Sequence, residues 1–291
     1  MNNKEGFKNI LIVGLGLIGG SIAKRLKEIS YSGDVFGLDR DLAILQNAYT
    51  NSLVKNNSIN SLEGLEDILI IFCTPVLSFN EALESVLSLQ PSEQAVFTDT
   101  LSTKSQVLEL LISEYESIKN RFVLSHPIAG SERSGLENSK DSLFVERITV
   151  ISPHETNENH HIDRVADFWK ELGSSTKILS SKDHDAIFAK TSHLPHVISY
   201  ALMQSLFGNL HDKTFEFSGG SLEDYTRIAS SDPIMWKDIF ISNNENILKS
   251  IEDFELSLKE LKELIKQQDD EAIVKFLKDT KTLRDSALEN D

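Results

Sequence analysis

Apolar runs of three to six residues alternate with segments of helical apolar spacing through the first 180 residues. The runs are apolar at almost every position, which is typical of strands that are covered on both faces. They are expected to be strands at residues 10–13, 35–38, 68–73, 95–98, 122–124, 147–151 and 177–179. The alternation predicts an α/β domain of the Rossmann type, built on a doubly wound parallel sheet.

The pattern changes beyond about residue 180, where the spacing is helical throughout. Residues 186–206 form a long, mostly apolar stretch that Pro195 interrupts. Farther along, apolar residues recur at steps of three and four, and we call this set the apolar seam: Ile251, Phe254, Leu258, Leu261 and Ile265. A stripe of this kind is normally buried against another surface. We predict a first domain over residues 1–180 and an all-helical domain over residues 181–291, with the seam as a homodimer interface.

A glycine motif, G-x-G-x-x-G, follows the first predicted strand and opens a helical pattern. Gly14 would make a tight turn, Gly16 would let backbone amides approach a pyrophosphate, and Gly19 would let the helix pack closely on the strand. Such a turn often has no ligand, but the strand before it and the helix after it favour a dinucleotide site. Leu17 and Ile18 lie within the motif and are expected to contact the cofactor.

The second predicted strand ends at Asp39, twenty residues beyond Gly19, where a dinucleotide-binding fold places the residue that contacts the ribose. A carboxylate there accepts hydrogen bonds from the ribose hydroxyls and repels a 2′-phosphate, so NAD is favoured over NADP. Arg40 works against this preference, and Asp39 could instead cap the helix predicted at residues 42–48. The turn after the third strand should line the same site: Cys73, Thr74 and Pro75.

The formal net charge is −16, which argues against nucleic acid or an anionic membrane as a general partner. An anionic substrate would therefore need a locally placed cation. The single cysteine excludes an internal disulfide and suits a reducing compartment. No signal-peptide pattern or membrane-length apolar run is present, so we expect a cytoplasmic location.

Polar clusters follow the predicted strands and open the helical half of the chain. One cluster contains Asp99, Ser102 and Lys104 and continues at residues 125–132. The others are the run HLPH at residues 193–196 and the run DYTRIA at residues 224–229. Two histidines three residues apart could bind a metal, but Pro195 between them and the lack of an acidic or cysteine partner make this the weaker interpretation. We expect no metal.

With these clusters the sequence resembles the prephenate and arogenate dehydrogenases of tyrosine biosynthesis, over nearly its whole length. The resemblance rests on GLGLIGGS, on D-x-x-S-x-K at residues 99–104, on HPIAGSE at 126–132, on HLPH, on TRIA and on SDPIMW. In that family a hydride passes from a ring carbon to NAD while the ring carboxylate leaves as carbon dioxide. Aromatisation of the ring drives the step.

The resemblance implies roles for the residues expected near the reacting ring. His126 would accept the hydrogen bond of the ring hydroxyl, a task that suits a neutral imidazole. Ser102 would hydrogen-bond the same hydroxyl or orient the imidazole. The plainer alternatives are a strand-end histidine that caps a turn and a serine that caps a helix.

The resemblance also implies the residues that hold the substrate. Arg227 would bind the substrate carboxylate, unless it forms only a surface ion pair with Asp224, which we also place at the substrate site. His196 would contact the pyruvyl side chain, and Ser131 and Glu132 would line or gate the cleft. The remaining histidines are expected to be structural, packing or surface residues: His160, His161, His184, His193 and His211.

The sequence therefore leads to an NAD-dependent oxidative decarboxylase that converts prephenate to 4-hydroxyphenylpyruvate, with His126 and Ser102 as catalytic residues. Arogenate is the nearest alternative substrate. A 3-hydroxyacid dehydrogenase shares the glycine motif and a helical second domain, but HPIAGSE argues against it. A protein that binds NAD without catalysis is the alternative outside the enzymes.

Overall fold

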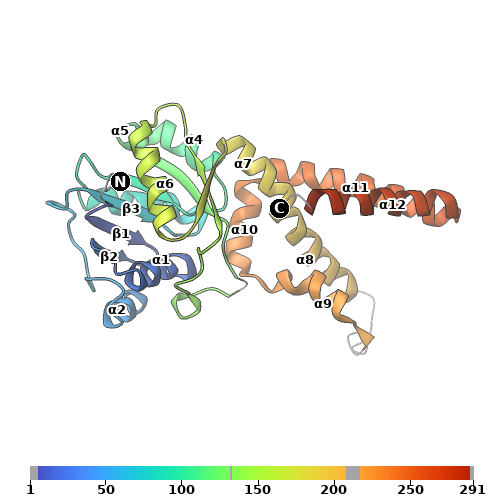
Figure 1. Cartoon of the computed structure of the whole chain (residues 1–291), viewed down its shortest axis with the longest axis horizontal. Coiled ribbons are helices and arrows are strands. Elements are labelled where there is room, and N and C mark those ends of the chain that lie inside the picture. Colours follow the sequence, from blue (N-terminus) through green and yellow to red (C-terminus); the bar gives the residue numbers. More distant parts are fainter. Residues whose placement is uncertain (1–5, 132, 208–216, 289–291) are drawn as a thin grey trace. The chain divides into compact units, whose positions relative to one another are not determined.

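The computed structural model describes residues 6–131, 133–207 and 217–288 (Figure 1). The chain divides into two compact units, Met1–Asn244 and Glu245–Asp291. Among the described residues, all strands lie in the first unit, and the second unit is helical. The predicted domain boundary near residue 180 lies inside the first unit and stays a prediction.

A mostly parallel sheet forms the centre of the first unit. Within the described residues its order is β2-β1-β3-β4-β5-β6-β7. The bounds of the strands are β1 Asn9–Val13, β2 Asp34–Leu38, β3 Ile68–Phe72, β4 Val96–Asp99, β5 Phe122–Pro127, β6 Ile148–Ser152 and β7 Ser175–Ile178.

The sheet differs from the prediction at one pairing, because β5 and β6 run antiparallel. In the segment between them, the described residues 128–131 and 133–147 contain a single helical element, the 3-10 turn η2 (Leu136–Asn138). A parallel neighbour needs a crossover, usually a helix, whereas an antiparallel neighbour can be reached by a loop. The strands from β1 to β5 are parallel to one another, and β7 is parallel to β6.

Two apolar cores cover the two faces of the sheet. Alternate residues of one strand enter different cores: Ile10 and Ile12 pack on one face, and Leu11 and Val13 on the other. The first face is covered by α1 (Leu17–Glu28), α2 (Leu42–Thr50) and α6 (Asn159–Glu171). The second is covered by α3 (Phe79–Ser88), α4 (Ser105–Glu114) and α5 (Glu116–Lys119), with the turn η1 (Val76–Ser78) before α3. This double coverage explains why the central strands β1 and β3 are apolar at almost every position.

Helices complete the first unit after β7. They are α7 (Ser181–Phe188), the π-helical turn η3 (Ala189–His193), α8 (Leu194–Phe207), α9 (Gly220–Thr226), the 3-10 turn η5 (Arg227–Ser230) and α10 (Pro233–Ser242). Pro195 lies in the first turn of α8, where a missing backbone N–H is tolerated. Asp232 caps α10 by accepting hydrogen bonds from the backbone N–H groups of Ile234 and Met235, both at 2.9 Å.

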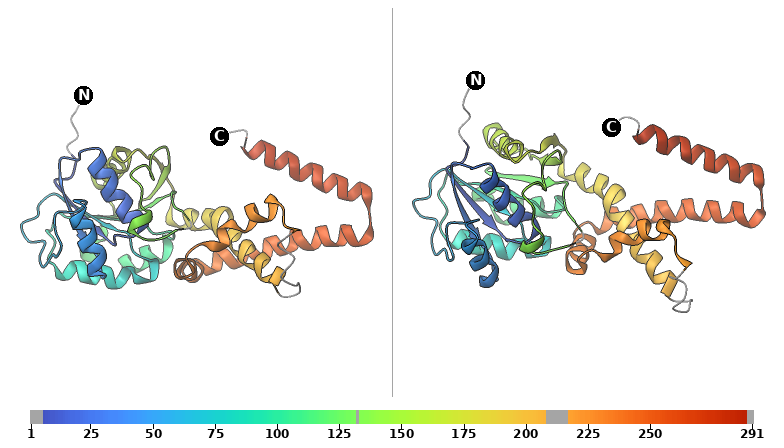
Figure 2. Two further views of the ribbon diagram at one scale, coloured as in Figure 1. Left: turned by 90° about the horizontal axis from the view of Figure 1, so that it is seen from below. Right: turned by 60° about the horizontal axis from the view of Figure 1, so that its bottom comes forward.

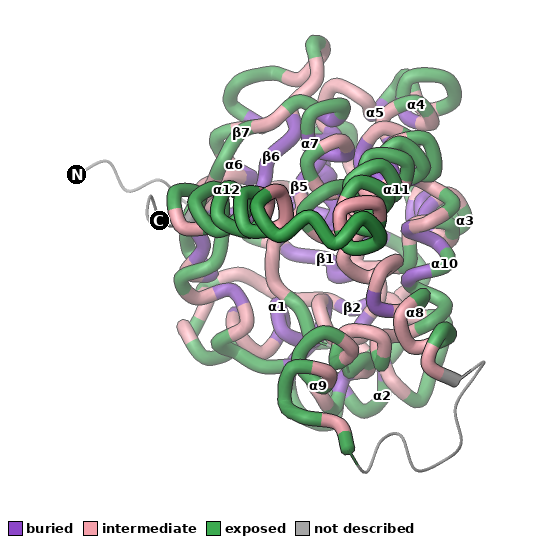
Figure 3. The backbone as a smooth tube through the Cα atoms, turned by 90° about the vertical axis from the view of Figure 1, so that its right-hand side faces the viewer, coloured by how far each residue is buried: buried purple, intermediate pink, exposed green. Residues whose placement is uncertain are grey.

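The second unit consists of α11 (Asn244–Gln267), whose first residue belongs to the first unit, and α12 (Asp270–Leu288), joined by a short turn (Figure 2). The apolar seam lies on α11 and is exposed or only half-buried along its length (Figure 3). Leu258 and Ile265 are 53% and 59% exposed. Among the described residues, no helix combines the length and the apolar character that crossing a membrane requires.

Candidate active site

The glycine turn joins β1 to α1 and requires glycine at two positions. Gly14 has a φ of +90°, and a Cβ atom there would lie 2.8 Å from the carbonyl oxygen of Cys73. A Cβ atom on Gly19 would lie 1.9 Å from the carbonyl oxygen of Gly14, so any side chain would separate α1 from β1. A Cβ atom on Gly16 would meet nothing within 4 Å. Gly16 therefore borders open space, as the approach of a ligand to the backbone requires.

The start of α1 is suited to an anion. Gly16 is the N-cap, no side chain caps the helix, and the first turn has no acidic residue. The N-terminal amides of a helix that has no side-chain cap are available to a phosphate, and the helix dipole favours the negative charge. The residues present therefore fit the pyrophosphate of a dinucleotide.

Asp39 is held beside the glycine turn at the end of β2. Its carboxylate accepts hydrogen bonds from the backbone N–H groups of Leu15 at 2.7 Å and Asp41 at 2.9 Å. The cap of α2 is Asp41, which accepts a hydrogen bond from the N–H of Ala43. The helix-cap alternative for Asp39 is therefore wrong, because the chain turns before the helix begins. The exposed Arg40 follows Asp39 directly.

The turn after β3 adjoins the same glycines. The hydroxyl oxygen of Thr74 is buried and has no hydrogen-bond partner among the described residues. A buried hydroxyl of this kind is normally satisfied by a ligand or a water molecule. Burial raises the pKa of the Cys73 thiol to about 12, so Cys73 stays protonated and behaves as a packing residue. Pro75 is exposed at the end of the turn.

A buried ion pair fixes the backbone next to His126. Asp99 at the end of β4 and Lys104 before α4 form this pair, and both side chains are fully buried. The Lys104 Nζ donates to the carbonyl oxygen of Ser125 at 2.8 Å, and the N–H of Ser125 donates to Asp99 Oδ1 at 2.9 Å. The indole N–H of Trp169 donates to the Ser125 hydroxyl at 3.0 Å. Asp99 and Lys104, the first and last residues of D-x-x-S-x-K, thus hold the backbone of β5 at Ser125.

His126 belongs to a chain of hydrogen bonds that sets its tautomer. The Asp185 carboxylate can only accept, so His184 donates from Nδ1 to Asp185 Oδ1 at 2.8 Å. Neutral His184 then carries a lone pair on Nε2, which must accept from His126 Nδ1 at 2.8 Å. Neutral His126 is left with its own lone pair on Nε2. Through these two hydrogen bonds, the Asp185 carboxylate makes Nε2 of His126 a hydrogen-bond acceptor.

Asp185 is itself held by backbone amides and ties α7 to α4. It accepts hydrogen bonds from the N–H groups of Lys104 and Ser105, both at 2.8 Å. Burial opposes its ionisation, but hydrogen bonds from His184 and Ser105 lower its pKa below the usual value. The side-chain amide of Asn243 donates to the carbonyl oxygen of Asp185 at 2.9 Å.

The same amide nitrogen of Asn243 lies 3.2 Å from Nδ1 of His193, which accepts from it. His193 is almost fully buried, and its burial lowers its pKa to about 4. A neutral, buried histidine that accepts from an amide supports the structural role expected for it.

The surroundings of His126 keep its imidazole neutral. Burial, followed by the positive charges that His184 and Lys104 can carry, lowers its pKa well below 6.5. The ring of Phe188 lies 5.1 Å from the ring of His126 and contributes to this burial. An imidazole that stays neutral at physiological pH can accept a proton or a hydrogen bond.

Ser102 lies half-buried in the loop between β4 and α4. The alternative in which it caps a helix is wrong, because the N-cap of α4 is Lys104 and the carboxylate of Asp185 accepts from the first amides. Its role toward the ring hydroxyl or the imidazole stays a prediction.

His196 lies at the start of α8 against Trp236. The two rings are stacked with their centroids 3.5 Å apart. His196 Nδ1 donates to the carbonyl oxygen of Ser192 at 2.9 Å, so neutral His196 carries its lone pair on Nε2. Burial lowers its pKa, and the nearby charge of Arg227 lowers it further. The structure thus brings His196 and Arg227 into one electrostatic environment.

Arg227 lines a cavity of about 640 Å³. Asp224 and Tyr200 also line it, together with other residues of α8, α9 and η5. His126 and His196 do not line this cavity. His126 therefore lies at the end of strand β5 and Arg227 lies among the helices. The two residues do not line the same cavity.

The loop after β5 carries the remaining predicted residues. Ser131 is exposed, and its hydroxyl donates to the carbonyl oxygen of Arg133 at 3.0 Å and accepts from the N–H of the same residue. Glu132 lies outside the described residues.

Two family models together match most of the chain. Residues 22–178 match the family model described as "Prephenate dehydrogenase, nucleotide-binding domain", and residues 180–279 match "Prephenate dehydrogenase, dimerization domain". The chain belongs to the prephenate dehydrogenase family. The family and the predicted fold class are thereby confirmed, apart from the antiparallel strand pair.

Similar proteins within the prephenate dehydrogenase family carry different substrate names. Prephenate dehydrogenase from A. aeolicus, solved in complex with hydroxyphenyl propionate and NAD+, is 35% identical with a TM-score of 0.90, over 98% of this chain and 100% of that one. Arogenate dehydrogenase from Synechocystis is 25% identical with a TM-score of 0.78, over 96% and 100% of the chains. Cyclohexadienyl dehydrogenase from Zymomonas mobilis is 30% identical over 96% of this chain and 95% of its own length.

Sequence reasoning missed two residues of the candidate site. His184 was expected only to pack or lie on the surface, and Asp185 was not considered. The structure buries both and connects them to His126. The available signal was an adjacent His-Asp pair just before the helical stretch predicted at residues 186–206, but 58 positions separate His184 from His126 in the sequence. Only the packing of α7 beside β5 reveals the contact.

Proposed function

We propose that the protein catalyses the NAD-dependent oxidative decarboxylation of prephenate to 4-hydroxyphenylpyruvate. The observation that carries this proposal is the chain from Asp185 through His184 to His126, which leaves a neutral imidazole with a free lone pair at the carboxyl end of β5. That is the edge of the sheet where Gly16 and Asp39 fit a dinucleotide.

The reaction requires a hydrogen-bond acceptor at the ring hydroxyl. Bound NAD supplies the hydride acceptor. As the carbon that bears the hydroxyl loses its hydride, the C–O group gains carbonyl character and its proton becomes more acidic. His126 Nε2 stabilises this change by accepting the hydroxyl hydrogen bond. The ring carboxylate leaves as carbon dioxide, and the electron pair of the broken bond completes the aromatic ring.

The remaining residues are proposed to hold the substrate and the cofactor. Arg227 binds a substrate carboxylate, because its planar guanidinium can donate two parallel hydrogen bonds. Residues 1–180 would bind NAD, and residues 181–291 would position the substrate and form a homodimer. The exposed apolar seam and the match to a dimerization domain support the homodimer. His196, Ser102, Ser131, Glu132 and Asp224 complete the proposed site.

Arogenate is a second candidate substrate, for a reason that His196 provides. Its Nδ1 donates to Ser192, so a neutral His196 offers only a hydrogen-bond acceptor at Nε2. An acceptor suits the amino group of arogenate, whereas the keto group of prephenate needs a donor. Prephenate would therefore require a protonated His196 or another donor beside it.

The decisive experiment measures NADH or NADPH formation by the purified full-length protein. Prephenate and arogenate are each combined with NAD and with NADP, and kcat/KM is determined for the four pairs. The proposal predicts the highest kcat/KM for prephenate with NAD. A preference for arogenate would replace the substrate and retain the chemistry. Binding of NAD without turnover on either substrate would contradict the enzymatic function.

A further inference from the structure

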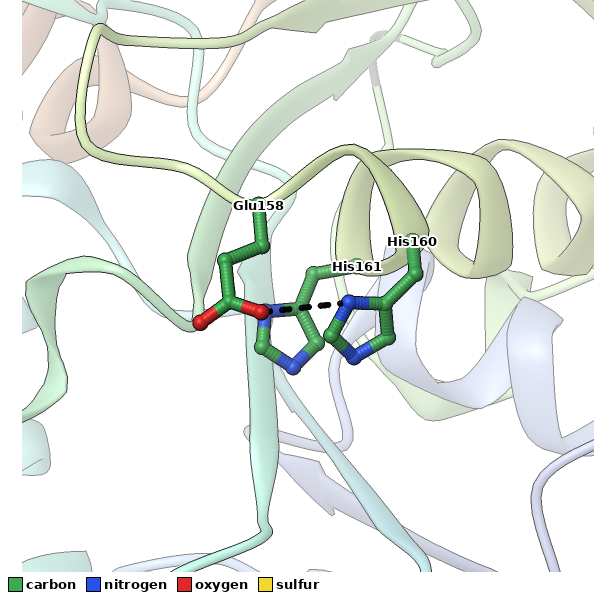
Figure 4. A group of neighbouring side chains, drawn as sticks. All are labelled: Glu158, His160 and His161. Atoms are coloured by element: carbon green, nitrogen blue, oxygen red, sulfur yellow. Dashed lines mark ion pairs between the residues drawn. The ribbon is translucent and has the colours of Figure 1, made fainter.

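A second cluster of titratable side chains lies away from the proposed dehydrogenase site. Glu158, His160 and His161 come from the start of α6 and point toward one another (Figure 4). One possible metal-ligand atom from each residue lies within 4.8 Å of the other two. Glu158 Oε2 and His160 Nδ1 are 3.3 Å apart. Ligand atoms of a tetrahedral zinc ion are separated by roughly 3.3 Å when the bonds are about 2.0–2.1 Å.

His161 supplies an independent indication of a ligand. The residue is only 7% exposed, and its Nδ1 has no hydrogen-bond partner among the described residues. A buried ring nitrogen without a partner is costly, and a bound cation would satisfy it.

The charges around the cluster favour a cation. The three side chains border a cavity of about 360 Å³, which the carboxylates of Asp67 and Glu93 and the guanidinium groups of Arg121 and Arg164 also line. Arg164 pairs with Asp67 at 2.6 Å, and Arg121 donates to backbone carbonyl groups. With Glu158, the cavity therefore has three carboxylates against two guanidinium groups. These groups sum to a net charge of −1, because the Asp67 carboxylate is paired with Arg164 and Glu158 and Glu93 stand against Arg121, whose charge the backbone carbonyl groups do not neutralise.

We propose that Glu158, His160 and His161 form a binding site for a divalent transition-metal ion of the zinc type. Two imidazoles and one carboxylate suit such an ion, with water as the fourth ligand. Glu158 and His160 are exposed, so the ion can enter from solvent. The site lies where β3, β4 and β5 begin, and His126 lies near the opposite end of β5. The ion would stabilise the first turn of α6 and take no part in hydride transfer.

The experiment titrates zinc chloride into the full-length protein at neutral pH, in competition with a zinc-binding dye. We expect one ion per chain. Substituting either exposed ligand, as His160→Ala or Glu158→Gln, should weaken zinc binding by about ten-fold or more. Loss of a residue that only hydrogen-bonds to a metal ligand already costs about ten-fold, and loss of a ligand should cost at least as much. The matched control is Glu155→Gln, which removes an exposed carboxylate three residues earlier and should leave the affinity unchanged.

Cobalt substitution provides a second measurement. Visible absorption of bound Co²⁺ should show low-coordinate geometry with nitrogen ligands in the unaltered protein and should be lost in His160→Ala. Failure to bind zinc, or equal affinity in the two ligand variants and the unaltered protein, would overturn the proposal. Equal affinity would place the ion at other histidines, such as His193 and His196. None of these outcomes depends on which substrate the dehydrogenase site prefers.

Discussion

His126 derives its chemical character from two neighbours that are distant in sequence. Its imidazole is neutral because it is buried beside His184 and Lys104, and its Nε2 is free because Asp185 fixes the tautomer of His184. A carboxylate that orients a histidine base in this way is a recurring device in enzymes. The position of the proton on the His126 ring thus depends on α7, the helix that carries His184 and Asp185.

Replacing His126 with Asn should lower kcat by roughly two to four orders of magnitude, the usual contribution of acid–base catalysis. Asp185→Asn should lower kcat by roughly 10²-fold with a smaller effect on KM, because it removes the group that orients the imidazole. Steady-state kinetics over a range of pH measures both. In the unaltered protein the acid limb of kcat/KM should lie below pH 6.5, because the pKa of His126 is lowered and protonation removes the acceptor. The control is His154→Asn, near the other end of β5, and near-normal turnover by the His126 variant would refute its role.

At the scale of elements, different glycines of the turn between β1 and α1 serve helix packing and ligand binding. Gly19 permits contact between α1 and β1, whereas Gly16 borders open space. Both glycines belong to one motif, but a Cβ atom would meet the Gly14 carbonyl oxygen at Gly19 and no protein atom within 4 Å at Gly16. The strand-turn-helix unit is therefore a structural joint and a ligand surface at the same time.

Gly16→Ala should fold normally and lose at least about ten-fold in NAD affinity, because its methyl group would occupy the space a pyrophosphate needs. Gly19→Ala should lower the melting temperature, because its Cβ would lie 1.9 Å from the Gly14 carbonyl oxygen. Thermal unfolding with and without NAD distinguishes the two effects. Equal loss of stability in both variants would contradict the division of roles.

The apolar seam is the other element-scale feature that makes a prediction. Leu258 is 53% exposed although it belongs to an apolar stripe, as expected of a surface that a second chain covers. Leu258→Asp should shift the protein toward monomer in sedimentation velocity. Lys259→Asp, on the charged side of α11, should leave the assembly unchanged. An unchanged mass for Leu258→Asp would exclude the seam from the interface.

At the scale of the whole molecule, buried neutral histidines couple stability to pH. The folded state lowers the pKa of His126, His184 and His193. Below pH 6.5 the unfolded chain binds more protons than the folded one, so the free energy of unfolding falls as the pH is lowered. His193, with a folded pKa of about 4, alone accounts for about 3 kcal/mol of this loss, complete once the pH falls below 4.

Urea denaturation at a series of pH values tests this coupling. The free energy of unfolding should decrease between pH 6.5 and 4, and the decrease should be smaller in His193→Gln, which cannot be protonated. An equal dependence on pH in both proteins would show that His193 is not the group responsible.

The sequence determined the elements and the family because both depend on local patterns. Uniformly apolar runs identify strands that are covered twice, and G-x-G-x-x-G restricts the turn between β1 and α1 through sterics within a few residues. HPIAGSE and HLPH located His126 and His196 for the same reason. The apolar seam also predicted a surface that the chain itself leaves partly exposed.

The direction of β6 and the residues that contact His126 were decided only by the tertiary structure. The direction of β6 depends on the path of a loop, because a strand sequence is the same in either orientation. His184 and Asp185 join the site because α7 packs beside β5 and α4, a contact between residues separated by more than fifty positions. The candidate metal site at Glu158, His160 and His161 could be recognised only in the structure, where Nδ1 of His161 is buried and has no hydrogen-bond partner within the described part of the chain. Proton positions and burial arise from tertiary contacts, which no local pattern encodes.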